Sequence, residues 1–388
     1  MTTPSSTVRS GAQTTLIVAL IGFWAYAAAK MKFEAHRGTK PEQRERLKEA
    51  IPLAGSSGVS EKWYDYCSFV TRSIATSLTI GFSALLVLLF IWAYPAGPGV
   101  DVQELLKQWL HGKWKEIARS YPHRELFVWG KFLAVVIPYY SFALIGAYLD
   151  FFCPRSVRPF KIQEDYWPSV KDYLRCLPLV LFNTALLVPI LYATYPVYTY
   201  FAIEPFGPLP PFWILLVQFP VFISTAEVVF YFPHRWLHTK WAFQNIHYLH
   251  HEYTAPIALA SVYAHPVEFV LSNVVPFVVG PIMCGTHMSV WLLWTIIGTC
   301  NTSIGHIGYQ LPFLGRRQAH DWHHRAVHLG MYDLGSHLMD NLFGTDENYL
   351  ESWQSKVDQN YRTPDYPVDK ILASQKDDQN AKQLCVSA

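Results

Sequence analysis

Long apolar runs divide the chain into segments that are long enough to cross a membrane. A hydrocarbon core of roughly 30 Å requires about 20 apolar residues in a helix. Five runs reach or approach this length, at residues 14–29, 69–94, 126–152, 177–201 and 211–232. Arg9 is the only basic side chain before the first run, so we predict a membrane anchor there rather than a cleaved signal peptide.

A sixth apolar region, at residues 267–304, is too long for one helix and is interrupted by the sequence CGTH at 284–287. We predict a helical hairpin whose legs of about 17 residues are just long enough to cross the membrane at ~1.5 Å per residue. A hairpin returns the chain to the side from which it started. The segments before and after it should therefore meet at one membrane face.

The composition agrees with a polytopic membrane protein. Charged residues make up 15% of the 388 positions, against roughly 25% in soluble proteins, and aromatic residues make up 16%. The formal net charge of +2 is too small to indicate a nucleic-acid partner. The six cysteines form no CxxC pair, so neither a disulfide framework nor a cysteine zinc site is favoured. The predicted fold class is an all-α membrane helical bundle.

The same pattern predicts four segments and an orientation. The segments are an anchor with a basic loop at 1–66, transmembrane helices at 67–210, a histidine-rich domain at 211–349 and a polar tail at 350–388. Lysine and arginine are frequent at 30–48 and 155–175 and absent from 202–211, and cytosolic loops carry the excess of these residues. The histidines after Phe232 should therefore face the cytosol, although basic residues between 97 and 124 argue against this assignment.

Histidines are concentrated in one part of the chain, since thirteen of the sixteen lie between His234 and His337. Three groups have helical spacing, and they are His234 with His238, then His247, His250 and His251, then His320, His323 and His324. On a helix each group shares one face, with neighbouring side chains ~5–6 Å apart. Neutral imidazoles that converge in this way form a cation site.

The number of imidazoles narrows the choice of metal. With His306, which follows an apolar leg in "SIGHIGYQ", nine histidines are available. They exceed the ligands of any single zinc, and HExxH zinc enzymes need a glutamate where this chain has Arg235. An all-nitrogen site suits iron, copper, nickel or zinc, and iron readily activates O₂ beside an apolar substrate. We predict a histidine-rich helical cap that holds a dimetal site.

The histidine groups and the words between them resemble the membrane sterol desaturase/fatty acid hydroxylase superfamily. "HEYTAPIALASVYAHPVE", "GHIGYQLP", "HDWHH" and "NLFGTDENY" are similar to the C4-methylsterol oxidase branch and to fatty acid hydroxylase domain-containing proteins. The resemblance extends from about residue 219 to residue 349, a third of the chain.

This resemblance implies a di-iron centre in a protein of the endoplasmic reticulum membrane. It implies O₂ as the oxidant and electrons from NAD(P)H through cytochrome b5 and its reductase. The implied iron ligands are His234, His238, His247, His250, His251, His306, His320, His323 and His324.

Five further residues are candidates for orienting the ligands. Glu227 lies seven residues before His234 on the same helix face, and it either supports a ligating imidazole or pairs elsewhere in the bundle. Asp321 and Asp346 either orient imidazoles or serve as surface and capping residues. His265 and His328, like His287, are weaker candidates that could equally lie at the surface.

The predicted function is hydroxylation of an unactivated C–H bond in a membrane lipid, of the C4-methylsterol type. A fatty acyl or sphingolipid hydroxylase, or another sterol hydroxylase or desaturase, is the alternative within enzymes. A metal transporter would carry its histidines within the spans, whereas these mostly follow them. A sterol-binding scaffold without activity would have lost some of the ligands.

Overall fold

The computed structural model describes residues 102–152, 160–163, 166–211, 213–310 and 317–352, together with Val18 and Gly22. The predicted spans at 14–29 and 69–94 lie outside the described residues, apart from these two positions. The same holds for almost all of the predicted tail at 350–388.

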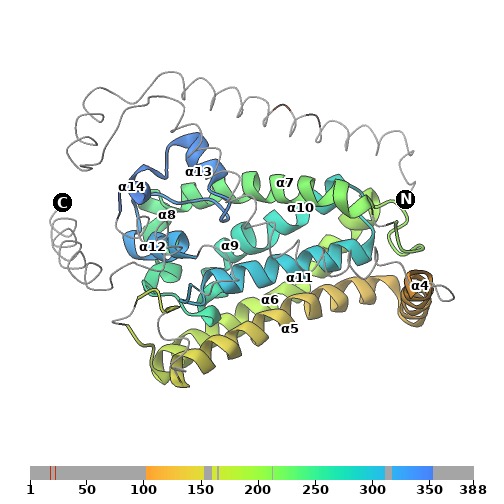
Figure 1. Cartoon of the computed structure of the whole chain (residues 1–388), viewed down its shortest axis with the longest axis horizontal. Helices are drawn as coiled ribbons and strands as arrows, with labels where there is room; N and C mark the ends of the chain where they lie inside the picture. The colour runs from red at the N-terminus through yellow and green to blue at the C-terminus, as the bar shows by residue number, and fades with distance from the viewer. Residues whose placement is uncertain are drawn as a thin grey trace.

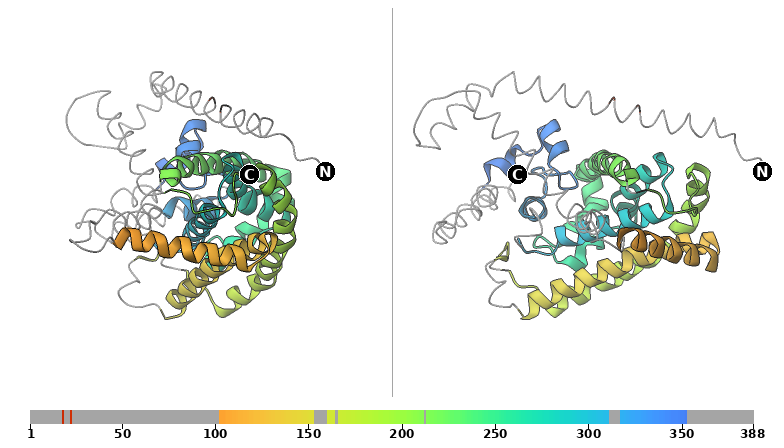
Figure 2. Two further views of the ribbon diagram at one scale, coloured as in Figure 1. Left: turned by 90° about the vertical axis from the view of Figure 1, so that its right-hand side faces the viewer. Right: turned by 45° about the vertical axis from the view of Figure 1, so that its right-hand side comes forward.

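Long helices lie side by side in one bundle, and α4 crosses one of its ends (Figure 1, Figure 2). The long elements are α4 (Val102–Ser120), α5 (His123–Phe152), α6 (Val170–Phe201), α7 (Trp213–Leu237), α10 (Val275–Met283) and α11 (Met288–Gly305). The shorter ones are α8 (Lys240–Asn245), the 3-10 helices η2 (His247–Glu252) and η3 (Ala258–Val262), α9 (Pro266–Glu268), the π-helix η4 (Phe269–Val274), α12 (Gln318–Ala326), α13 (Leu338–Phe343) and α14 (Glu347–Glu351). No strand occurs among the described residues, so the all-α prediction is confirmed.

Four helices are long and apolar enough to cross a membrane: α5, α6, α7 and the continuous stretch Pro266–Met283. The first three correspond to the predicted runs at 126–152, 177–201 and 211–232. Their outer faces are apolar and exposed, as at Leu144 and Phe152 of α5, which is the surface that lipid requires. The protein is therefore a multi-pass membrane helical bundle.

The predicted hairpin is present, with α10 ending at Met283 and α11 beginning at Met288. Its first leg, Pro266–Met283, is a candidate membrane span, whereas α11 is not among the four, so the prediction that the legs can cross is confirmed for the first leg only. Gly285 has φ 56, a left-handed conformation that glycine adopts without steric cost. Its carbonyl oxygen accepts from the Ile203 N–H at 3.0 Å, and the Met288 N–H donates to the Pro205 carbonyl at 2.9 Å. These bonds fix the hairpin turn against the α6–α7 connection, at the end of the bundle that α4 crosses (Figure 1).

The opposite end of the bundle is called the cap end here, because α8, α12, α13 and α14 cover it (Figure 1). A buried network holds several chain segments together there. Asp150, near the end of α5, accepts from the Lys161 ammonium at 2.8 Å, the Tyr173 hydroxyl at 2.7 Å and the Tyr309 hydroxyl at 3.0 Å. The end of α5, the start of α6 and the end of α11 thus lie at the same face, as the hairpin predicted.

Candidate metal centre

All nine predicted ligands lie at the cap end, on four separate segments. His234 is in the last turn of α7 and His238 follows it. His306 is the C-terminal capping residue of α11, and α12 carries the "HDWHH" group. The "HYLHH" group lies on the 3-10 helix η2 rather than on an α-helix, because the chain turns sharply between α8 and Tyr253.

The nine imidazoles divide into two sets of potential ligands, and the ligand atoms within each set lie within 4.8 Å of one another. The five-histidine set is His234, His238, His247, His251 and His323, and the four-histidine set is His250, His306, His320 and His324. Each HxxHH group therefore supplies both sets, so that the adjacent residues His323 and His324 belong to different ones.

The spacing of the ring nitrogens fits metal coordination. In the five-histidine set, Nε2 of His247 lies 2.9 Å from Nε2 of His238 and 3.0 Å from that of His251. In the other set, Nε2 of His306 lies 2.9 Å from that of His320 and 3.3 Å from that of His250. A metal at about 2.1 Å from each ligand separates neighbouring nitrogens by about 3.0 Å at right angles and about 3.4 Å in a tetrahedron.

In several rings, a backbone carbonyl oxygen determines which nitrogen carries the proton and which is unprotonated. Nδ1 of His250 lies 3.2 Å from the Tyr263 oxygen, and Nδ1 of His306 lies 2.9 Å from the Thr302 oxygen. A carbonyl oxygen only accepts, so Nδ1 must carry the proton in both rings. Their Nε2 atoms, 3.3 Å apart, are then both acceptors and cannot bond to each other. A cation between them resolves this conflict.

The same orientation recurs in the five-histidine set. Nδ1 of His234 lies 2.8 Å from the Tyr332 oxygen, and Nδ1 of His323 lies 2.9 Å from the Gly330 oxygen. The buried Nε2 atom of His323 has no hydrogen-bond partner in the described structure, as expected of an atom reserved for a metal. In metal sites, a hydrogen bond donated by the ring nitrogen that does not bind the metal fixes the orientation and the tautomer of the imidazole.

Glu268 is a residue of the site that the sequence reasoning did not single out. Its Oε1 atom lies 2.7 Å from Nδ1 of His247, and both side chains are buried. A carboxylate beside a ligating imidazole raises the basicity of the ligand. The signal was present in "AHPVE", which places an acid three residues after His265, but only the fold shows that this acid meets the His247 ring.

Burial keeps the imidazoles outside the spans neutral, which leaves their nitrogen lone pairs available for a metal. Burial lowers the pKa of His250 and His323 to about 4 and that of His306 to about 3. Burial, with a smaller effect from neighbouring imidazoles, holds the pKa well below the ordinary value for His238, His247, His251, His320 and His324.

The three predicted acidic residues accept hydrogen bonds from groups other than imidazoles. Glu227 accepts from the Leu334 N–H at 3.3 Å, on the loop that also carries the carbonyl partner of His234. Asp321, within "HDWHH", accepts from the Gln163 amide at 3.1 Å and is buried. Asp346 accepts from Asn341 at 3.3 Å, and burial raises its pKa to about 6.

The weaker histidine candidates lie outside both sets. Nδ1 of His265 accepts from the Val267 N–H at 3.2 Å and caps α9. His328 is exposed, with its ring 6.0 Å from that of His238. His287 caps α11 through the Ser289 N–H, at the far end of the bundle from the nine imidazoles.

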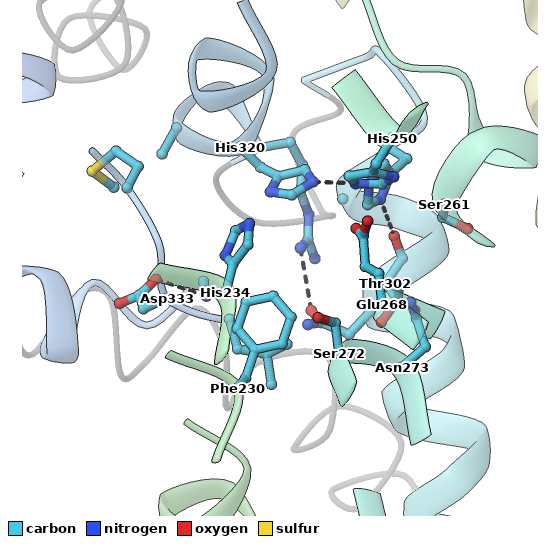
Figure 3. A pocket seen from close by; sticks show the side chains of 18 of the residues that line it. Phe230, His234, His250, Ser261, Glu268, Ser272, Asn273, Thr302, His320 and Asp333 are labelled. Atoms are coloured by element: carbon cyan, nitrogen blue, oxygen red, sulfur yellow. Dashed lines mark hydrogen bonds between the residues drawn. The ribbon is translucent and has the colours of Figure 1, made fainter. Parts of the chain in front are cut away.

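A cavity of about 80 Å³ opens beside both sets. Figure 3 shows the rings of His234, His250 and His320 and the carboxylate of Glu268 around it, with Phe230 on one side. Met331 and Leu334 add apolar surface to the lining. The cavity thus places apolar side chains beside both histidine sets.

Comparisons with known proteins agree with this geometry. The Fatty acid hydroxylase family model matches residues 219–345, the region that holds both histidine sets. The chain is 38% identical over 174 residues to fatty acid hydroxylase domain-containing protein 2 of Macaca fascicularis, covering 45% of this chain and 52% of that protein. The chain thus spans about half the length of that relative. No solved structure matches.

Two further relatives are covered over most of their length. The chain is 34% identical over 202 residues to very-long-chain aldehyde decarbonylase GL1-11 of Oryza sativa subsp. indica, covering 49% of this chain and 75% of that protein. It is 34% identical over 181 residues to methylsterol monooxygenase 2-2 of Arabidopsis thaliana, covering 44% of this chain and 68% of that protein. Since the similarity extends over more than two thirds of these relatives, the chain belongs to the fatty acid hydroxylase family, within the membrane sterol desaturase/fatty acid hydroxylase superfamily.

Proposed function

We propose that the protein is a di-iron oxidoreductase that hydroxylates an unactivated C–H bond of a membrane lipid. The observation that carries this proposal is the pair of adjacent all-imidazole sets that open on one cavity at the end of a transmembrane bundle. The five-histidine set would hold one iron and the four-histidine set the other. Bound iron would supply the activation of O₂ and the removal of hydrogen from carbon.

The residues of the chain supply ligands, orientation and a dry environment. The backbone carbonyl contacts and Glu268 hold the imidazoles with Nε2 directed inward. A C–H bond offers no charge to bind, so the lipid must be positioned by packing against apolar side chains such as Phe230 and Leu334. The position at the membrane end of the cap lets a lipid enter from the bilayer.

A C4-methylsterol is the first candidate substrate, because one relative is named a methylsterol monooxygenase. An acyl lipid, or a sterol oxidised at another carbon, is the second candidate, and it is favoured by a polar group in a further cavity, described below. Electrons would come from NAD(P)H through cytochrome b5 and its reductase. The protein would reside in the endoplasmic reticulum membrane with the metal centre facing the cytosol, and residues 211–349 would form the catalytic domain.

The test combines metal content with turnover. Purified iron-loaded protein, supplied with NADPH, cytochrome b5, its reductase and a 4-methylsterol or an acyl lipid, should consume O₂ and release an oxidised lipid. Alanine at His247, His250, His320 or His323 should abolish oxidation and lower the iron content. His328→Ala is the matched control, because this exposed imidazole belongs to neither set.

Full iron content and full oxidation in the four alanine variants would contradict the proposal. Metal flux across vesicles without O₂ consumption would indicate a transporter instead. Lipid profiling of a deletion strain then separates the substrates, since accumulated 4-methylsterols support the first candidate and altered hydroxy acyl chains the second. Material purified without added iron should contain zinc, which binds nitrogen ligands more tightly than Fe²⁺.

A further inference from the structure

A second cavity, of about 70 Å³, adjoins the first one inside the helical bundle. It lies between α5, α6, α10 and α11, and most of its surface is apolar. Ser261, Asn273 and Thr302 line both cavities. Figure 3 shows these three side chains on one side of the first cavity, beside Glu268. The two cavities share this part of their lining, so a lipid chain that passed these residues would extend into the bundle.

Lys131 lies at the far end of the second cavity. Along α11 the lining runs from Thr302, at the boundary of the two cavities, through Thr299 to Thr295. This seven-residue separation corresponds to about 10 Å of helix. The Lys131 ammonium donates to the Thr295 hydroxyl at 2.6 Å and lies 4.0 Å from the centre of the Trp291 ring.

The amino group of Lys131 has no acidic partner among the described residues. The residue is 4% exposed, and no ion pair joins it to a carboxylate in the part of the chain that the structure describes. The amino group of a lysine has more than one N–H donor, and the Thr295 hydroxyl accepts from one of them. An ionisable side chain buried within a transmembrane helix is costly and is therefore a candidate functional residue. The missing partner is an acceptor oxygen.

We propose that Lys131, which the Thr295 hydroxyl orients, binds the oxygen-bearing end of the lipid substrate, a hydroxyl or a carboxylate. This inference rests on the proposed lipid oxidation and specifies which carbon is oxidised. Thr295 and His306 are eleven residues apart on α11, which corresponds to about 16 Å. The oxidised carbon would then lie far from the bound oxygen, at the opposite end of the lipid.

This arrangement distinguishes between the candidate substrates. The C4 methyl group of a sterol is adjacent to the carbon that carries the hydroxyl, so oxidation there would place the alkyl tail against Lys131. A sterol held by its hydroxyl would instead present its side chain to the metal centre. A fatty acid held by its carboxylate would present a carbon remote from the carboxyl group.

The test measures binding of paired lipids to metal-loaded protein in nanodiscs. The pairs are radiolabelled cholesterol with cholestane as competitor, and radiolabelled palmitate with hexadecane as competitor. In each pair, only the labelled lipid carries oxygen. The wild-type protein should prefer the oxygenated member of at least one pair by tenfold or more. Preference for cholesterol identifies a hydroxyl as the bound group, and preference for palmitate identifies a carboxylate.

Lys131→Met should abolish this preference, and Lys131→Arg should retain most of it because N–H donors remain at this position. Lys171→Met, which removes an exposed lysine at the start of α6, is the matched control and should bind like the wild type. Metal content should be unchanged in all three variants. With turnover, the position of the introduced oxygen should become mixed in Lys131→Met only.

Two outcomes would overturn the inference. One is a wild-type protein that prefers neither oxygenated lipid over its hydrocarbon partner. The other is a Lys131→Met variant that keeps the wild-type preference. Failure of the proposed function is separate, because it would appear as absent iron or absent oxidation in the wild-type protein while lipid binding is still measured.

Discussion

Replacing Glu268 by glutamine tests how the protein tunes one of its two metal sites. Oε1 of Glu268 lies 2.7 Å from Nδ1 of His247, and that imidazole belongs to the five-histidine set. The substitution keeps the size of the side chain and removes its charge. It should therefore weaken the binding of iron to the five-histidine set and leave the binding of iron to the four-histidine set unchanged.

The expected magnitude follows from the burial of the pair. The two side chains are 1% and 3% exposed, so solvent screens their interaction weakly. Loss of such a partner of a ligating histidine typically lowers metal affinity by about 10- to 100-fold. This range corresponds to roughly 1.4 to 2.7 kcal/mol for one of the two ions.

Anaerobic equilibrium dialysis against graded free Fe²⁺, followed by metal analysis, gives the affinity of each ion. In Glu268→Gln, one binding step should move to a 10- to 100-fold higher Fe²⁺ concentration and the other should stay in place. Glu116→Gln is the matched control, because Glu116 lies on the exposed surface of α4 and pairs with Lys113. An equal shift of both steps, or no shift with an intact fold, would refute the reasoning.

Three other properties can be predicted. Because burial lowers the pKa of His250 and His323 from 6.5 to about 4, the metal-free folded protein binds fewer protons than the unfolded chain in this range. Its stability should be highest above pH 6.5 and fall by on the order of 3 kcal/mol per group as the pH drops to about 4, measured by denaturation across pH. Asp150→Asn should cost about 3–5 kcal/mol in thermal unfolding, since it leaves the buried Lys161 ammonium without its carboxylate; an unchanged melting temperature would contradict this. Gly298→Ala should cost about 1–3 kcal/mol in the same assay, because the added methyl group would overlap with a phenylalanine ring of α10 that lines the second cavity.

The sequence predicted the features that depend on local pattern. The runs at 126–152, 177–201 and 211–232 are readable because the thickness of the bilayer sets the length of an apolar helix. The turn at 284–287 could be predicted from the sequence because this stretch holds the glycine that the turn requires. The histidine spacing is readable because i, i+3 and i+4 positions are neighbours on a helix.

The features that depend on tertiary contacts could not be predicted in this way. Spacing groups His323 with His324, whereas the structure assigns them to different sets, because adjacent residues point about 100° apart around a helix and the two ring centroids lie 5.9 Å from each other. The contact of Glu268 with His247 joins residues 21 positions apart through the turn of η3 and α9. The alignment of Lys131 with Thr295 depends on how α11 packs on α5.

The division of the nine imidazoles into two interleaved sets is tested most directly by the iron content of two double variants. His238→Ala with His323→Ala removes two ligands from the five-histidine set, so this protein should retain one iron per chain. His323→Ala with His324→Ala removes one ligand from each set, so both irons should be weakened and lost together on dialysis. Equal iron content in the two variants, or more iron in His323→Ala with His324→Ala than in His238→Ala with His323→Ala, would contradict the account.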